Sequence, residues 1–154
     1  MSYEIKDSLG IGVLGVVLAG VLNDGGFRAV REFTDFDSRA EEECQAVWSV
    51  EGYELCQEEL RADTGLGAVK GKVRYKVKLM GQAGCHEDYA EFEDRCGEVC
   101  GKLMAFRRYG RIRCGLGEVK RDMQQRRLVR ELEVIFEVWL KENAQAEDGK
   151  EAGT

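Results

Sequence analysis

The sequence contains no proline and a single histidine, His86. Because proline is absent, every turn must rely on Gly, Asn, Asp or Ser. The chain also has no Gly-rich nucleotide-binding loop after a strand and no internal repeat, which excludes the fold types that these features mark. It carries no catalytic motif either, so the residues by themselves do not name a reaction.

The main apolar run, residues 11–22, is short. A helix needs about 20 apolar residues to cross a bilayer, so we expect no membrane span. A secretory signal is the other interpretation of such a segment. However, Glu4 and Asp7 precede it against a single Lys6, and no clear A-x-A cleavage site follows. We therefore expect neither secretion nor a membrane partner.

Positive charge is in deficit overall, since the net charge is −6. The protein as a whole is therefore not built to coat nucleic acid, although a local basic surface remains open. The six cysteines are irregularly spaced in a chain of 154 residues, which is large enough to bury a core. This pattern favours reduced thiols in a cytosol over a disulfide framework.

Two stretches of alternating residues predict the centre of a sheet. In Val69–Met80 apolar residues share one parity and cations the other. In residues 128–141 one face is apolar, and the other carries Glu131, Glu133 and Glu137 together with Ile135 and Trp139. Opposite charges across antiparallel strands contribute roughly 0.2–1 kcal/mol per pair, so we expect these two strands to be neighbours. The cations of the first stretch are Lys70, Lys72, Arg74, Lys76 and Lys78.

The remaining periodicity predicts an α+β domain over residues 1–142, followed by a disordered polar tail over residues 143–154. We expect a mostly antiparallel sheet of about five strands with two helices packed on one face. Part of residues 11–18 could instead be a strand, and Gly52 predicts a bulge or bend. The expected order is helix 2–22, strands 27–33, 44–56 and 69–80, helix 86–103, and strands 107–119 and 128–141, with a polar turn over residues 120–127.

Candidate catalytic and metal-binding groups are few. Cys85 and His86 are adjacent, and adjacent side chains at a helix start usually diverge, so we interpret His86 as a helix-start residue and not as a base for the thiol. Cys96 and Cys100 are four residues apart on the apolar stripe of the second helix, where a cysteine serves as a small hydrophobe more readily than as a zinc ligand. We expect no catalytic residue, no metal and no cofactor.

The basic residues have two interpretations. The cations of Val69–Met80 can be half of a solvated, salt-bridged sheet face, or they can line a passage for an anionic polymer. We favour the solvated face, because no aromatic residues are interleaved to stack on bases. A second basic cluster comprises Arg107, Arg108, Arg111 and Arg113, and a third comprises Arg126, Arg127 and Arg130.

Apolar side chains in charged surroundings predict an interface. Ile135 and Trp139 lie among the glutamates, which suggests that another subunit covers this face. The apolar run near the N-terminus is too continuous for a one-sided helix, so Val16 and Val17 are further candidates.

The order of elements resembles the tail-terminator proteins of long-tailed phages and prophages. The resemblance covers residues 5–141: an N-terminal helix with a Gly25-Gly26 exit, a hairpin, GKVRYKVKLM, the helix YAEFEDRCGEVCGKL and the closing GEVKRDMQQRRLVRELEVIFEVWL. It implies a structural protein without catalytic residues. Such a protein forms a hexameric ring that caps the tail tube and joins it to the head.

The implied partners are further copies of the chain, the tail tube protein, the head–tail connector protein and, without sequence specificity, passing DNA. The cations of Val69–Met80, here called the lysine stripe, or the cluster of Arg107, Arg108, Arg111 and Arg113 would then face the lumen. The implied location is the virion tail, or the bacterial cytoplasm during assembly. The alternative is a small cytosolic bacterial α+β enzyme or ligand-binding domain, which would need a deep polar pocket and would leave Trp139 outside an interface.

Overall fold

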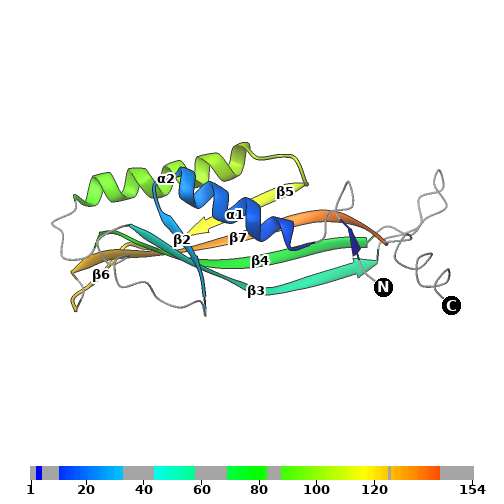
Figure 1. Ribbon diagram of the computed structural model, residues 1–154, viewed down its shortest axis with the longest axis horizontal. Helices are drawn as coiled ribbons and strands as arrows, with labels where there is room; N and C mark the ends of the chain where they lie inside the picture. The colour runs from blue at the N-terminus through cyan, green and yellow to red at the C-terminus, as the bar shows by residue number, and fades with distance from the viewer. Residues whose placement is uncertain are drawn as a thin grey trace.

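A computed structural model describes residues 3–4, 11–32, 44–57, 69–82, 88–124 and 126–142. Over these residues the chain is α+β, with two helices and a seven-stranded sheet (Figure 1). The helices are α1 (Val13–Asp24) and α2 (Tyr89–Ala105). The strands are β1 (Tyr3–Glu4), β2 (Arg28–Arg31), β3 (Gln45–Gln57), β4 (Val69–Met80), β5 (Arg111–Leu116), β6 (Lys120–Asp122) and β7 (Arg127–Glu142).

Three long antiparallel strands, β3, β4 and β7, form the centre of the sheet. Strand β4 pairs with β7 from Val69 to Met80, as the opposite charges of the two strands predict. The other side of β7 pairs in succession with β6, β5 and β1. Strand β2 adds to β3 in parallel. The predicted sheet is therefore confirmed, with two very short strands, β1 and β6, added to the five expected.

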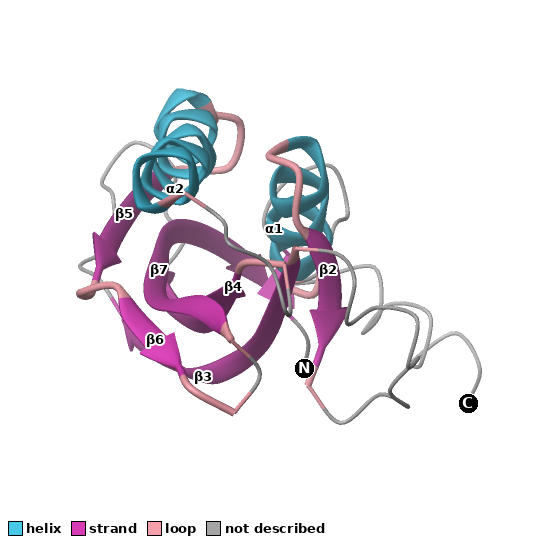
Figure 2. Cartoon of the chain, turned by 90° about the vertical axis from the view of Figure 1, so that its left-hand side faces the viewer, coloured by secondary structure: helices cyan, strands magenta, loops and turns pink. Residues whose placement is uncertain are grey.

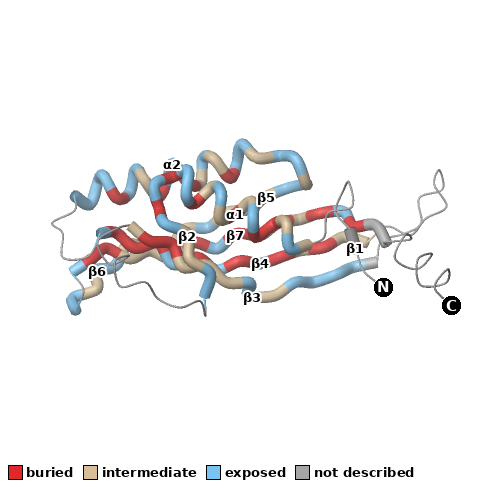
Figure 3. Tube along the Cα trace, viewed as in Figure 1, coloured by how far each residue is buried: buried red, intermediate tan, exposed pale blue. Residues whose placement is uncertain are grey.

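Both helices cover the same face of the sheet, as predicted (Figures 1 and 2). Leucines 14, 18 and 22 of α1 recur at four-residue steps, and Phe92, Cys96, Val99 and Leu103 of α2 recur at three- and four-residue steps; all are fully buried. They pack on the apolar residues of β4 and β7, where Tyr75 and Phe136 meet edge to face with their ring centroids 5.6 Å apart. Figure 3 shows the resulting alternation of buried and exposed residues along β4 and β7.

Two glycines allow the helices to approach their neighbours closely. A Cβ on Gly15 would lie 3.0 Å from the ring of Trp48, and a Cβ on Gly25 would collide with Cγ2 of Val99. The first glycine brings α1 down onto β3, and the second brings the end of α1 against α2. Gly12 and Gly20 have no atom within 4 Å of such a Cβ, so packing does not explain them.

Several boundaries differ from the expectation. Tyr3 and Glu4 form a strand paired with the end of β7, where a helix from residue 2 was predicted. The two residues are extended because they pair with a long neighbouring strand. Residues 13–18 are helical, so the alternative strand is wrong there. The predicted turn over residues 120–127 begins with β6, and Arg126 then reverses the chain with a φ of 51°. The loop predicted between β2 and β3, His86 and the polar tail lie outside the described residues.

The predicted irregularity at Gly52 is confirmed as a bulge, because the register of β3 against β4 shifts between Val50 and Gly52. Helix α2 begins at Tyr89 after Asp88, whose carboxylate accepts a hydrogen bond from the Ala90 amide at 3.1 Å. Neither helix in the described part of the chain is long and apolar enough to cross a membrane.

Candidate interaction surface

The sheet face opposite the helices, here called the charged face, collects most of the predicted basic residues. The cations of β4 all point to this face, because they alternate with the buried residues of the strand. Each of them is flanked by β3 on one side and β7 on the other. Each cation thus lies in a row with one residue of β3 and one residue of β7, and the successive rows form a ladder along the charged face.

Cations and carboxylates oppose one another in three of these rows. Lys72 lies opposite Glu137, Lys76 opposite Glu133 and Lys78 opposite Glu131. The Nζ atom of Lys76 is 3.7 Å from Oε1 of Glu131, and these side chains are 56% and 66% exposed. Exposed pairs of this kind contribute at most about 1 kcal/mol to stability. The ladder therefore serves more to align β4 with β7 than to stabilise the fold.

Glu137 is the most shielded carboxylate of the ladder. Its side chain is only 10% exposed, and its Oε1 lies 3.8 Å from a terminal nitrogen of Arg113. Its cross-strand neighbours are Lys72 of β4 and Arg111 of β5. Two predicted basic groups thus merge here, because β5 places Arg111 and Arg113 on the same face as the lysine stripe.

The other predicted basic residues do not join this face. Arg107 and Arg108 lie in the connection between α2 and β5, and the Arg108 guanidinium sits 5.3 Å from the centre of the Tyr109 ring. Arg127 is buried, and its guanidinium donates to the sulfur of Met80 at 3.4 Å. Arg130 points to the helix side of the sheet, where its Nε donates to the Gly117 carbonyl at 2.7 Å. The third basic cluster is therefore not one surface.

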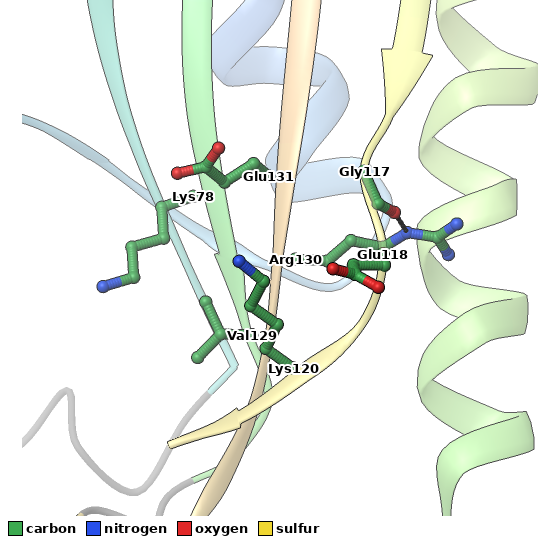
Figure 4. A pocket seen from close by; sticks show the side chains of 7 residues that line it. All are labelled: Lys78, Gly117, Glu118, Lys120, Val129, Arg130 and Glu131. Atoms are coloured by element: carbon green, nitrogen blue, oxygen red, sulfur yellow. Dashed lines mark hydrogen bonds between the residues drawn. The ribbon is translucent and has the colours of Figure 1, made fainter.

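One hollow of about 490 Å³ opens on the charged face beside the β5–β6 connection (Figure 4). Acidic and basic side chains are mixed around it, with Glu118 and Glu131 beside three cations. Among the described residues, no group of His, Cys, Asp and Glu is arranged to hold a metal ion. The residues lining the hollow are Lys78, Gly117, Glu118, Lys120, Val129, Arg130 and Glu131.

The four candidate interface residues lie on two different faces. Trp139 is 51% exposed on the charged face, opposite Lys70, and Ile135 is half-buried between Arg74 and Arg113. Val16 is 70% exposed on α1, whereas its neighbour Val17 packs against the core. These residues cannot form one continuous apolar patch.

A further apolar group was missed by sequence reasoning. Val50, Tyr53 and Leu55 of β3 are exposed, although they point to the face that the helices cover. They lie in the part of β3 that follows its pairing with β2, and Figure 3 shows that the far end of β3 is exposed. An unbroken alternation of apolar residues along β3 would have revealed this group. The bulge at Gly52 interrupts the two-residue period, so Val50 falls on one parity and Tyr53 and Leu55 on the other.

The sheet also has two open edges in the described part of the chain. Strand β2 covers β3 only from Gln45 to Trp48, and no described strand pairs with the rest of that side of β3. No described strand pairs with the side of β5 that faces away from β7. The open part of β3 carries Glu51 and Glu54, whereas β5 carries Arg111 and Arg113. The unpaired part of β3 and the edge strand β5 therefore differ in the sign of their charge, although β2 adds Arg28 and Arg31 next to the β3 part.

The described surfaces thus combine a charged sheet face, exposed apolar residues on β3 and unpaired strand edges. No protein-family model matches this sequence, and no curated protein matches it significantly.

Proposed function

We propose that this protein is a structural component of phage or prophage morphogenesis, a ring-forming tail terminator that caps the tail tube and joins it to the head. The observation that supports this proposal most directly is the pair of open sheet edges with opposite charge. The order of elements, from the first helix to the long final strand, supports the particular family.

The open edges favour contact between copies of the chain. An uncovered edge strand presents unpaired N–H and C=O groups and is usually protected or paired. Here the acidic edge of β3 complements the basic edge of β5, so one copy can receive the next in a head-to-tail arrangement. Contacts of this heterologous type generate a closed ring when the rotation between copies closes.

The apolar residues beside the β3 edge support the same contact. Tyr53 is 60% exposed and Leu55 is 45% exposed, and both belong to the unpaired part of the strand. Aromatic side chains are enriched in protein interfaces. A neighbouring copy that pairs with β3 would bury them.

The charged face is the candidate surface for the lumen. Sheets joined edge to edge around a ring present one face to the central hole, and Lys76, Lys78 and Arg113 are exposed on this face. Because phosphate contacts depend on charge and not on sequence, such a face suits passing DNA. The glutamates of β7 would limit the attraction, so that DNA is not held.

The alternative, a small cytosolic enzyme or ligand-binding domain, has weaker support. It requires a deep pocket with convergent polar groups. The hollow beside β6 is open, and carboxylates and cations are mixed around it.

Deletion of the gene from a phage or prophage tests the proposed function. We expect tails of irregular length that are not joined to heads, visible by electron microscopy, and recovery when the wild-type gene is supplied in trans. Tails of normal length joined to heads in the absence of the gene would rule the proposal out.

A further inference from the structure

Three cysteines meet where α2 packs over β5. Cys96 and Cys100 lie one turn apart on the side of α2 that faces the sheet, and Cys114 belongs to β5 opposite Val134. Cys96 is fully buried, whereas Cys100 and Cys114 are half-buried. The side chains of Cys100 and Cys114 are hydrogen-bonded to each other across the two elements. The five cysteines that the structure describes are all thiols.

Arg130 supplies a positive charge beside this group. Its side chain leaves β7 on the helix side and points toward α2 (Figure 4), and its Nε is anchored to the Gly117 carbonyl at 2.7 Å. The guanidinium favours a thiolate at both Cys96 and Cys100. Because the arginine is tied to the β5–β6 connection, the charge stays in place when a thiol ionises.

The three thiols ionise differently. The hydrogen bond from Cys114 and the Arg130 charge together outweigh burial and lower the pKa of Cys100 to about 7. The same hydrogen bond and burial raise the pKa of Cys114, and burial raises the pKa of Cys96 to about 11. A thiolate is the reactive form of cysteine. The Arg130 charge acts on Cys100 and not on Cys114, so we assign Cys100 as the nucleophile of this group and Cys114 as the thiol beside it.

We propose that Cys100 and Cys114 are a redox pair, and that a low-molecular-weight disulfide such as oxidised glutathione converts them into a disulfide that ties α2 to β5. This inference does not depend on the proposed tail-terminator function. It rests on the contact between the two thiols, on the partial exposure of both, and on the anchored cation next to them.

The chemistry takes two exchange steps. The Cys100 thiolate attacks one sulfur of the small disulfide, whose S–S bond breaks, and one small thiolate leaves; Cys100 now holds a mixed disulfide. Cys114 then gives its proton to solvent and attacks the Cys100 sulfur, and the second small thiolate leaves. Two protein thiols are oxidised and one small disulfide is reduced to two thiols.

The surroundings allow the bond to close. A disulfide requires a sulfur–sulfur distance of about 2.0 Å, so the hydrogen-bonded sulfurs must move closer together. Strand β5 can supply this movement, because no described strand holds its outer side. The bond would fix the open-edge strand β5 beneath α2. Cys96 stays outside the reaction, since it is fully buried.

Native protein in glutathione redox buffer tests the proposal. The full-length reduced protein is incubated with oxidised glutathione, remaining thiols are alkylated, and peptides are mapped by mass spectrometry. We expect an internal disulfide between Cys100 and Cys114, with Cys96 still alkylated only after unfolding. A native protein that keeps both thiols while exposed Cys56 acquires glutathione would overturn the proposal, as would a disulfide that joins a different pair.

Serine variants distinguish the two roles. In C114S, Cys100 should retain glutathione as a trapped mixed disulfide; in C100S, no internal disulfide should form. The matched control is C56S, which removes an exposed cysteine on β3 and should form the internal bond as the wild type does. Circular dichroism verifies that each variant is folded. If C114S traps no more glutathione at Cys100 than the wild type does, the two-step route is wrong.

Discussion

Lys76 lies directly opposite Glu133 in the β4–β7 ladder, yet its ammonium group pairs with the carboxylate of Glu131, one row along, at 3.7 Å. Glu131 is itself opposite Lys78. The charges of the ladder are therefore shared between rows, and Glu131 and Glu137 each face more than one cation. A single reversal should disturb several weak contacts at once.

The diagonal pair predicts which reversal rescues Lys76→Glu. We expect K76E to lower the free energy of unfolding by about 1 kcal/mol or less, since the groups are exposed. Adding E131K should recover more of this loss than adding E133K, because the Glu131 carboxylate is the one in contact. Urea unfolding of the single and double variants gives both coupling energies. Zero coupling with either glutamate would mean that the ladder contributes no pairwise stability.

Two glycines beside or within α1 predict opposite effects of the same substitution. In G25A the new Cβ collides with Val99, so we expect a loss of about 1–3 kcal/mol from overpacking. In G20A the new Cβ meets no atom within 4 Å, so removal of glycine from the helix interior should add up to about 1 kcal/mol. Thermal and urea unfolding measure both. Equal effects of the two substitutions would contradict the close approach of α1 and α2.

Burial of Cys96 predicts a loss of stability in alkali. Burial raises the pKa of Cys96 from 9.0 to about 11, so the folded state favours the neutral thiol. The resulting stability is fully present below pH 9 and is lost as the pH rises toward 11. A shift of this size corresponds to about 2–3 kcal/mol. Burial also raises the pKa of Tyr75 to about 12, which extends the loss to higher pH.

The matched variant is C96A, which lacks the titrating group. It should be less stable than the wild type at pH 7, because a buried sulfur is lost, but its stability should fall less between pH 8 and pH 10.5. Urea unfolding with a reducing agent present measures both slopes. Parallel slopes for the two proteins would assign the alkaline loss to other groups.

The central strands could be predicted from sequence because their pattern is long and regular. Val69–Met80 has the predicted bounds, and the alternation of β7 places Leu132 and Trp139 on opposite faces as expected. Each strand carries enough apolar residues on one parity to fix its buried face, and the opposite charges identify the neighbour. The apolar repeat of α2 identified its buried side for the same reason.

Other features could not be predicted, because they depend on contacts between distant residues. Tyr3 and Glu4 have no strand pattern of their own and are strand only because β7 extends beside them. Cys114 approaches Cys100 only because α2 packs over β5, and the spacing of the cysteines along the sequence does not reveal this packing. The exposed group around Tyr53 depends on a bulge that moves apolar residues from one parity to the other.

The opposite charges of the two sheet edges give the most direct test of assembly. In the proposed ring, Glu51 and Glu54 of one copy meet Arg111 and Arg113 of the next. Reversal of either edge alone, as E51K/E54K or as R111E/R113E, should therefore place like charges at every contact. We expect each double variant to fail to restore joined tails in a phage that lacks the gene.

Supplying both double variants together should restore assembly. Each copy then carries two edges of the same sign, and copies of the two kinds can alternate around a ring with an even number of subunits, so that every contact again joins opposite charges. Because R111E/R113E also places acids beside Glu137, circular dichroism must verify its fold, and R111Q/R113Q serves as a milder variant that should weaken assembly without repulsion. The measurement is the number of joined tails seen by electron microscopy. If folded variants of both kinds fail together as completely as each fails alone, the two edges do not meet in the assembled particle.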